Sequence, residues 1–319
     1  MHENEWAQAQ SWIATTLADR RVAIAGGIEI SRDRPWSRVA RVPITDGQLW
    51  FKGNNTGTRY ESGLARTLGA LTPHQVLTPL AVDVERGWML LPDGGQTLRS
   101  FTGDTFDEAR WTSLLTRYAE LQRAVAPHAA DLLALGVPDV RPQLLPELFA
   151  GLLDDPYVVA SVSTENLAAL RGWQPTIDKL SARLASCGIA PSIQHDDLHT
   201  NNVFADADGG LRFFDFGDAS VAHPFGSMLV ALRVVHHEAK LEHGDPLLYR
   251  LRDVYLSAWT DVHDLAELQE ICQDAITVTK ISKALSYQRA LVDADEPTIA
   301  EYGDGIYGWL EELLGPDVL

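Results

Sequence analysis

The chain has 319 residues, of which 45% are hydrophobic and 22% charged, as in an average globular protein. Its net charge of −18 argues against a nucleic-acid partner, because such proteins gain most of their affinity from clustered lysine and arginine. No apolar run reaches the roughly 18 residues that a membrane span needs, so we expect no membrane association. The first residues, MHENEWAQAQSW, lack the basic and apolar regions of an export signal, and the chain has only two cysteines; we therefore expect a cytoplasmic protein.

Strand signals dominate the first 93 residues. Asp46-Gly47 separates two apolar runs and favours a tight hairpin. A helix is predicted after this hairpin, opened by the capping-box spacing Thr58-Arg-Tyr-Glu61 and closed by Pro73. Strands are predicted over 38–44, 49–52, 76–84 and 87–91. This part therefore predicts a small antiparallel sheet with one helix.

Helix signals dominate the rest of the chain. A first helix is predicted after Thr105-Phe-Asp-Glu108, which has capping-box spacing, and Pro127 ends it. The only clear strand signal lies near 202–214. No repeat or low-complexity linker is found, so we expect two lobes, 1–93 and 94–319, joined by a tight hinge. Further helices are predicted over 145–187, 225–241, 246–260, 264–290 and 297–314.

The charge is divided unevenly between these two parts. The first 93 residues contain 10 Lys and Arg and 10 Asp and Glu, so the whole net charge of −18 belongs to the remainder. One interpretation is ordinary solubilising surface charge. The other is an electrostatic potential that attracts a cationic ligand to the second part.

One segment of the second part carries the strongest functional signal. It reads Gln194-His-Asp-Asp-Leu-His-Thr-Asn-Asn-Val-Phe204 and contains the pattern His195-x-Asp197-x-x-x-x-Asn202. The triplet Asp215-Phe216-Gly217 follows it. From the composition of this chain, the first pattern arises by chance in about one or two of a hundred such sequences, and the triplet makes coincidence rarer still.

The residues on either side of Asp206-Ala-Asp-Gly-Gly210 predict a short hairpin. Strand pairing would bring Asn202 and Asp215 close together. An amide oxygen and a carboxylate are hard ligands, and they suit a magnesium ion that shares its shell with phosphates. A calcium loop beginning at Asp206 is excluded, because Gly217 stands where the twelfth-position glutamate should be.

These motifs resemble the aminoglycoside phosphotransferase and choline kinase group, relatives of the protein kinases. The resemblance extends from Lys52 to Asp218. It implies an α+β, bilobal protein-kinase-like fold, with a small N-terminal antiparallel sheet and one helix, and a larger, mainly helical C-terminal lobe. It also implies that Asp197 is the catalytic base, that Asn202 and Asp215 hold magnesium, and that His195 braces the loop. His195 could equally be a core hydrogen-bonding residue in any fold.

A kinase also needs a cation on the phosphates of ATP, normally a strand lysine paired with a helix glutamate. Lys52 and Glu61 stand at those places, although a capping box would use Glu61 locally instead. The loop before Ser37 lacks the glycines of the protein-kinase loop; the resemblance makes Ser37 a phosphate-contacting candidate, and a turn residue is the alternative. The adenine is expected against the backbone between Met89 and Leu91.

The expected activity is transfer of the γ-phosphoryl group of magnesium ATP to a hydroxyl of a small molecule. A protein kinase is disfavoured because the chain after Asp215 has no Ala-Pro-Glu motif. An inactive nucleotide-binding module has no need for the intact motifs. A sugar or amino-alcohol kinase of primary metabolism remains an alternative.

The acidic second part leads us to expect a cationic, amine-bearing acceptor, such as an aminoglycoside or an amino sugar. Several carboxylates near the predicted site are candidates for binding its ammonium groups, and the sequence does not choose among them. They are Asp154, Asp155, Asp293, Asp295, Glu296, Glu301 and Asp304.

Overall fold

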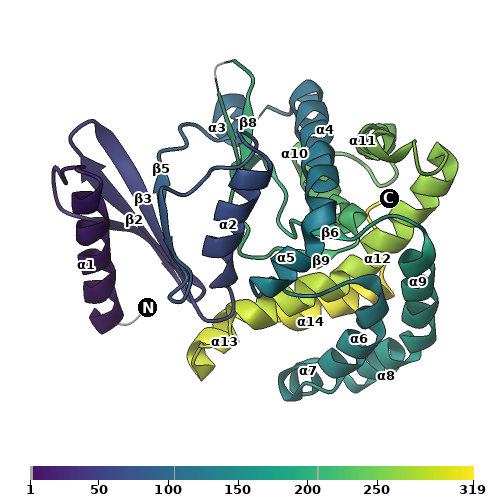
Figure 1. Ribbon diagram of the computed structural model, residues 1–319. Helices are drawn as coiled ribbons and strands as arrows, with labels where there is room; N and C mark the ends of the chain where they lie inside the picture. Colours follow the sequence, from purple (N-terminus) through teal and green to yellow (C-terminus); the bar gives the residue numbers. More distant parts are fainter. Residues whose placement is uncertain (1–2, 104, 207) are drawn as a thin grey trace.

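The computed structural model of the protein describes residues 3–103, 105–206 and 208–319, and Figure 1 shows a sheet at one end and helices through the rest. The sheet has five antiparallel strands in the order β1-β2-β3-β5-β4. Its elements are α1 (Glu3–Asp19), β1 (Glu29–Arg34), β2 (Ser37–Ile44), β3 (Gly47–Asn54), α2 (Tyr60–Leu71), β4 (Ala81–Asp83) and β5 (Trp88–Pro92).

The two helices of this part lie on opposite faces of the sheet (Figure 1). The rings of Trp6 and Trp12 on α1 lie 5.8 and 6.2 Å from the ring of Phe51 on β3. Successive side chains of a strand point to opposite faces. Packing Phe51 under α1 therefore turns its neighbour Lys52 to the other face, where α2 begins.

The helical part contains two small two-stranded antiparallel sheets in addition to its helices. One pairs β6 (Ser192–Gln194) with β9 (Ser220–Ala222), and the other is the hairpin of β7 (Val203–Ala205) and β8 (Leu211–Phe213), which lies between them in sequence. The α-helices are α3 (Leu98–Thr102), α4 (Glu108–Val125), α5 (Ala129–Ala134), α6 (Leu145–Leu153), α7 (Pro156–Ser161), α8 (Thr164–Gly172), α9 (Gln174–Ser186), α10 (Met228–Glu238), α11 (Pro246–Leu256), α12 (Leu265–Ala290), α13 (Glu296–Tyr302) and α14 (Asp304–Glu311).

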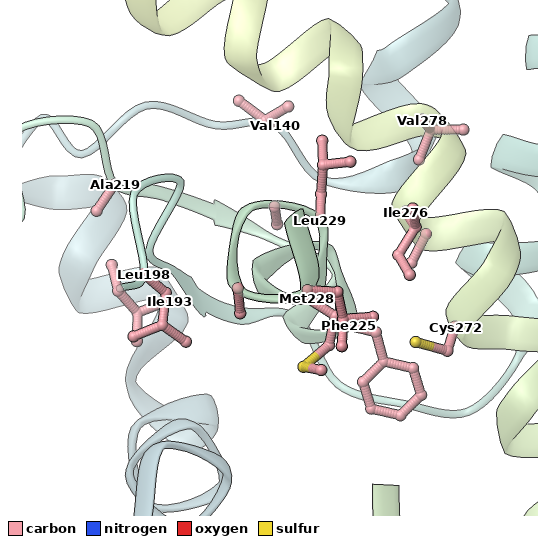
Figure 2. Close-up of a cluster of buried hydrophobic side chains, with 14 of the residues drawn as sticks. Val140, Ile193, Leu198, Ala219, Phe225, Met228, Leu229, Cys272, Ile276 and Val278 are labelled. Atoms are coloured by element: carbon pink, nitrogen blue, oxygen red, sulfur yellow. The ribbon is translucent and has the colours of Figure 1, made fainter. Parts of the chain in front are cut away.

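The core of the helical part is built around α12. Figure 2 shows Ile193 on β6, Phe225 in the 3-10 turn Pro224–Ser227, Met228 at the start of α10, and Cys272 and Ile276 on α12 in one cluster. All five residues are 0% exposed. Burying a large apolar side chain contributes about 1.5–3 kcal/mol. The strand that leads into the His195 motif is therefore fixed against the central helix.

Both predicted capping boxes are wrong. Helix α2 follows Arg59 without a side-chain cap, and the carboxylate of Glu61 is directed to Lys52 instead. Helix α4 is capped by Asp107, whose carboxylate accepts from the backbone N–H of Arg110, and not by Thr105. A buried ammonium is a stronger partner for Glu61 than an exposed backbone N–H, and Asp107 lies next to the first helical residue.

The structure confirms the α+β class, with a small antiparallel sheet followed by a larger helical part. It adds α1, β1, α3, α5, β6 and β9, which we did not predict. The division at residues 93 and 94 stays a prediction; Gly94 there lies so close to Phe204 of β7 that a Cβ atom would come within 2.3 Å of its ring. No helix among the described residues is long and apolar enough to cross a membrane.

Candidate active site

Strand pairing brings the two predicted metal ligands to the open end of one hairpin. Val203 of β7 pairs with Phe213 of β8, and the N–H of Phe214 donates to the carbonyl of Asn202 at 3.1 Å. Asp215, the next residue, has a backbone φ of +64°. Such a conformation costs a residue other than glycine about 1–3 kcal/mol and recurs at functional sites.

Lys52 links the sheet to this hairpin. Its Nζ lies 2.7 Å from Oε2 of Glu61, which is the predicted ion pair, and 2.6 Å from Oδ1 of Asp215. Burial opposes a charge on Lys52, but the two carboxylates outweigh it and raise its pKa above the ordinary value. Gly217 leaves room for this ion pair, since a Cβ atom at position 217 would lie only 3.3 Å from Oε2 of Glu61.

The carboxylate of Asp197 is held by its own loop. The side-chain amide of Asn202 donates to Oδ2 of Asp197 at 3.0 Å, and Nε2 of His199 lies 3.2 Å from the same oxygen. Burial would raise the pKa of Asp197, but the hydrogen bond from His199 and the positive charge of Lys283 lower it below the ordinary value. The Asp197 side chain is still 41% exposed, so an ionised carboxylate faces the cavity.

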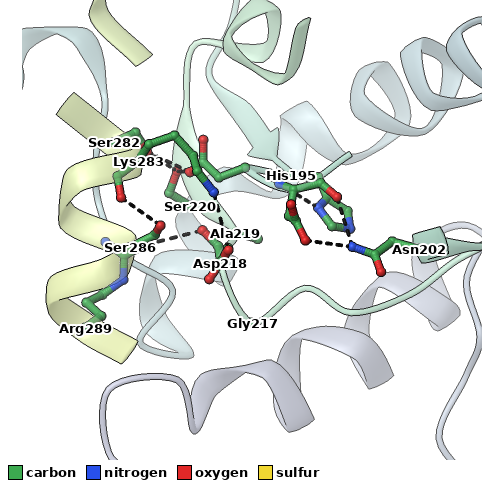
Figure 3. Close-up of polar contacts among 12 residues, drawn as sticks. His195, Asn202, Gly217, Asp218, Ala219, Ser220, Ser282, Lys283, Ser286 and Arg289 are labelled. Carbon is green, nitrogen blue, oxygen red and sulfur yellow. Dashed lines mark hydrogen bonds and ion pairs between the residues drawn. The ribbon is translucent and has the colours of Figure 1, made fainter. Parts of the chain in front are cut away.

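His195 lies behind this loop, as Figure 3 shows. Its side chain is fully buried, and burial lowers its pKa, so the ring is neutral. Nδ1 accepts from the backbone N–H of Asp197 at 3.3 Å, which leaves Nε2–H to donate to the carbonyl of Phe214 at 3.0 Å. The neutral ring of His195 therefore forms hydrogen bonds both with the Asp197 loop and with Phe214, the residue before Asp215.

A cavity of about 690 Å³ brings almost all the predicted site residues together. Only His195 does not line it, which is consistent with its place behind the loop. The predicted residues that line the cavity are Ser37, Lys52, Glu61, Met89, Leu91, Asp197, Asn202 and Asp215.

A second cavity, of about 750 Å³, lies beside the first and shares Asp197, His199 and Asn201 with it. Its remaining walls come mainly from α10 and α12. None of the seven acidic residues predicted as acceptor ligands lines either cavity. Three of them, Asp293, Asp295 and Glu301, line a different cavity of about 920 Å³ beside the β1–β2 turn.

Two oxygens in the first cavity fit a magnesium ion. The described residues provide no hydrogen-bond donor for the amide oxygen of Asn202 or for Oδ2 of Asp215. No group of three or more His, Cys, Asp or Glu side chains among the described residues could hold a metal ion alone. This pair of oxygens suits magnesium, which binds few carboxylates and completes its shell with phosphates and water.

Sequence reasoning missed three residues near Asp197. His199 belongs to the motif itself, so its position two residues after Asp197 was an available signal. Asp196 is buried, and its carboxylate accepts from Ser282 at 2.7 Å. Burial raises the pKa of Asp196 to about 6, although the charge of Lys283 partly offsets this. Lys283 comes from α12, and no local pattern linked it to this site.

Residues 64–239 match the sequence model of the phosphotransferase enzyme family, APH. Comparison with curated protein sequences finds no match. The fold is similar to that of the GDP and kanamycin complex of APH(2")-IIia, with 17% identity, coverage of 96% of this chain and 98% of that chain, and a TM-score of 0.62. It is also similar to choline kinase LicA from Streptococcus pneumoniae, with 12% identity, coverage of 96% and 98%, and a TM-score of 0.61. A macrolide 2'-phosphotransferase type I is similar as well, with 16% identity, coverage of 92% of this chain and 95% of that chain, and a TM-score of 0.55.

Proposed function

Because this chain belongs to the phosphotransferase enzyme family, we propose that it transfers the γ-phosphoryl group of ATP to a hydroxyl of a small molecule. The observation that carries the proposal is the arrangement of Lys52, Asp197 and Asp215 around one cavity of about 690 Å³. A buried ammonium, a partly exposed carboxylate and a pair of metal-ligand oxygens are the groups that phosphoryl transfer needs.

Asp197 acts as the base in this proposal. Its Oδ2 is held by Asn202 and His199, so Oδ1 is left to accept the proton of the acceptor hydroxyl. The hydroxyl oxygen forms the new bond to the γ-phosphorus as the bond to the bridging oxygen breaks, and ADP leaves with that electron pair. Direct transfer of this kind needs no covalent phosphoenzyme.

Lys52 neutralises charge on the phosphates, and Asn202 and Asp215 would hold magnesium. The ion, when bound, supplies positive charge to the phosphate oxygens. Met89 and Leu91 lie on the same face of β5 and would contact the adenine, and Ser37 lies at the start of β2 near the phosphates. The solved complex with GDP makes GTP the donor to compare with ATP.

The class of acceptor follows less directly. The acidic second part favours an amine-bearing acceptor, and the similar structures include a kanamycin complex and a choline kinase. A sugar or amino-alcohol kinase of primary metabolism is the second candidate. A protein substrate fits poorly, because the chain after Asp215 runs within a few residues into β9, Ser220–Ala222, and leaves little length for a peptide-docking segment.

The test is ADP release coupled to an acceptor panel, together with nucleotide binding measured by calorimetry. We expect magnesium-dependent binding of ATP and acceptor-dependent release of ADP that is lost in Asp197→Asn. Tight ATP binding without turnover of any acceptor would favour a nucleotide-binding module. Failure to bind either ATP or GTP with magnesium would overturn the proposed function.

A further inference from the structure

The second cavity is lined by more cations than carboxylates, although the chain as a whole carries a net charge of −18. Arg99 pairs with Glu238, and Arg233 pairs with Glu312 outside the lining, so Lys240 and Lys283 supply the remaining positive charge. Its walls include four Arg and Lys side chains and only two carboxylates, and two of the five lysines of the chain are among them. The cations are Arg99, Arg233, Lys240 and Lys283, and the carboxylates are Asp197 and Glu238.

Glu238 is paired within the protein, and Asp197 has the role of the proposed base. Glu238 accepts from Arg99 at 2.6 Å, from the indole N–H of Trp111 at 3.2 Å and from the hydroxyl of Thr200 at 3.2 Å. Asp197 is held by its own loop and serves as the proposed base. Among the carboxylate oxygens of this cavity, Oδ1 of Asp197 is therefore left for the acceptor hydroxyl, and Glu238 is paired within the protein.

The aromatic rings of the cavity are also in contact with cations of the protein. The guanidinium of Arg233 lies 4.7 Å from the ring centre of Trp309. The ammonium of Lys283 lies 5.8 Å from the same ring and 5.7 Å from that of Tyr287. Sites for quaternary or primary amines use such ring faces to attract the cation of the ligand. In this cavity the rings already contact the cations of the protein, which disfavours an amine acceptor.

Lys283 has hydrogen-bonding capacity to spare. Its side chain is only 5% exposed, and among the described residues Asp218 provides its one hydrogen-bond acceptor, at 3.5 Å (Figure 3). An ammonium has three N–H donors. Burial opposes the charge, but Asp218, Asp197 and Asp196 outweigh it and raise the pKa of Lys283, so the group is cationic at neutral pH.

Lys240 lies in a backbone conformation that favours glycine. Its φ is +53°, just after the end of α10, where its N–H donates to the carbonyl of His237 at 3.2 Å. Glycine is the usual residue in this left-handed position after a helix, and another residue costs about 1 kcal/mol there. What distinguishes Lys240 from Arg21, an exposed cation with a φ of +58°, is that Lys240 lines the second cavity.

We propose that the second cavity binds an acceptor that carries a phosphate or carboxylate group together with the hydroxyl that is phosphorylated. The inference rests on the proposed function, because Asp197 joins this cavity to the nucleotide cavity. Lys240 and Lys283 bind the anionic group, and the acceptor hydroxyl faces Asp197. This acceptor class differs from the amine-bearing class that the net charge suggested.

The first experiment compares four sugars that share one ring and differ in charge: glucose 6-phosphate, glucuronate, glucose and glucosamine. We expect one of the two anionic sugars to have the highest kcat/KM, and which one it is distinguishes phosphate from carboxylate recognition. Preference for glucosamine or glucose would overturn the inference. If none of the four is turned over, the phosphate-binding experiment below decides the matter.

The second experiment uses inorganic phosphate as a probe of enzyme saturated with magnesium and a non-hydrolysable ATP analogue, which fills the first cavity. The melting temperature should rise with phosphate more than with sodium chloride at equal ionic strength. Lys240→Gly relieves the backbone conformation, so the variant folds, and it should weaken phosphate binding about 3–10-fold, as expected for the loss of one hydrogen bond of ordinary strength at an exposed side chain.

Arg21→Gly is the matched control, because Arg21 is an exposed cation with a φ of +58° that lines neither cavity. It should bind phosphate as the unmodified protein does. The inference fails if phosphate does not raise the melting temperature more than sodium chloride does. It also fails if phosphate raises the melting temperature of Lys240→Gly as much as that of the unmodified protein. The ATP analogue is also tested alone, to distinguish failure of the inference from failure of the proposed function. If the analogue does not raise the melting temperature, the proposed function fails. If it does, and phosphate does not, only the acceptor class is wrong.

Discussion

The Nζ atom of Lys52 lies 2.6 Å from Oδ1 of Asp215, although 163 residues separate the two in sequence. The same atom also contacts Glu61, which is 1% exposed. Removing Lys52 alone therefore leaves a buried carboxylate without its partner, which costs about 3–5 kcal/mol. The lysine is both a proposed phosphate ligand and a counter-ion within the fold.

We expect Lys52→Met to lower both the melting temperature and the affinity for magnesium ATP. The double variant Lys52→Met/Glu61→Gln should recover most of the stability but none of the nucleotide affinity, because it removes the unpaired carboxylate without restoring the cation. Thermal unfolding and calorimetry measure the two effects separately. Recovery of nucleotide affinity in the double variant would show that another cation contacts the phosphates.

Asp197→Asn should reduce kcat by about two to four decades and leave the dissociation constant of magnesium ATP nearly unchanged, because a base acts only in the transfer step. Steady-state kinetics with the best acceptor and calorimetry with ATP test this. The role of Asp197 fails if the variant turns over at the rate of the unmodified enzyme.

Asp215→Gly separates the backbone from the chemistry at that position. Glycine adopts the φ of +64° without strain, and Lys52 keeps Glu61 as its partner, so we expect a melting temperature no lower than that of the unmodified protein. Magnesium-dependent ATP binding should be lost, because one of the two oxygen ligands is gone. Calorimetry with and without magnesium measures this, and unchanged affinity would place the metal elsewhere.

His199→Ala should shift the acid limb of the profile of kcat/KM against pH to higher pH. The hydrogen bond from His199 helps to lower the pKa of Asp197, so without it the carboxylate takes up a proton at a higher pH and ceases to act as a base. His128→Ala, an exposed histidine that lines neither cavity, is the control. An acid limb that does not move would mean that His199 has no influence on Asp197.

Asp196→Asn tests the buried carboxyl beside the base. The pKa of Asp196 is about 6 in the folded protein and 3.8 as its ordinary value, so the unfolded chain loses this proton first as pH rises. The free energy of unfolding of the unmodified protein therefore falls by about 3 kcal/mol between roughly pH 4 and pH 6, and that of the variant does not. Urea unfolding across this range, with Asp206→Asn as an exposed control, measures the difference. A difference that is constant with pH would contradict the raised pKa.

The fold could be predicted from sequence where the signal is local. Asp46-Gly47 specified the β2–β3 hairpin because a tight turn needs only those residues. Strand β1 has no apolar alternation, since all six of its residues are exposed, and so gave no signal. Helix α1 did give one, because Ala9, Ile13 and Leu17 recur every four residues and are buried, but we did not use it.

The candidate site could also be predicted only where its residues lie close together in sequence. Asp197, Asn202 and Asp215 lie in one short segment, so their spacing was informative. Lys283 reaches the site from α12, and its neighbour Ser282 contacts Asp196 across 86 residues, which no local spacing encodes. Net charge averages over the whole surface, so it could not show that Arg99, Arg233, Lys240 and Lys283 line one cavity, and the amine-bearing acceptor that it favoured stays a prediction.

Helix α12 is a single unbroken helix of 26 residues, and three of its contacts define a fixed register. Ser282 donates to Asp196, Arg289 donates to the carbonyl of Asp218, and the carbonyl of Ala290 accepts from Asn55 in the sheet part of the molecule. Inserting one residue between positions 282 and 289 would rotate the later contacts by about 100°. Relatives that share these contacts should therefore differ here by replacement and not by length, so that new acceptors are acquired through side-chain changes at positions such as 283 and 287.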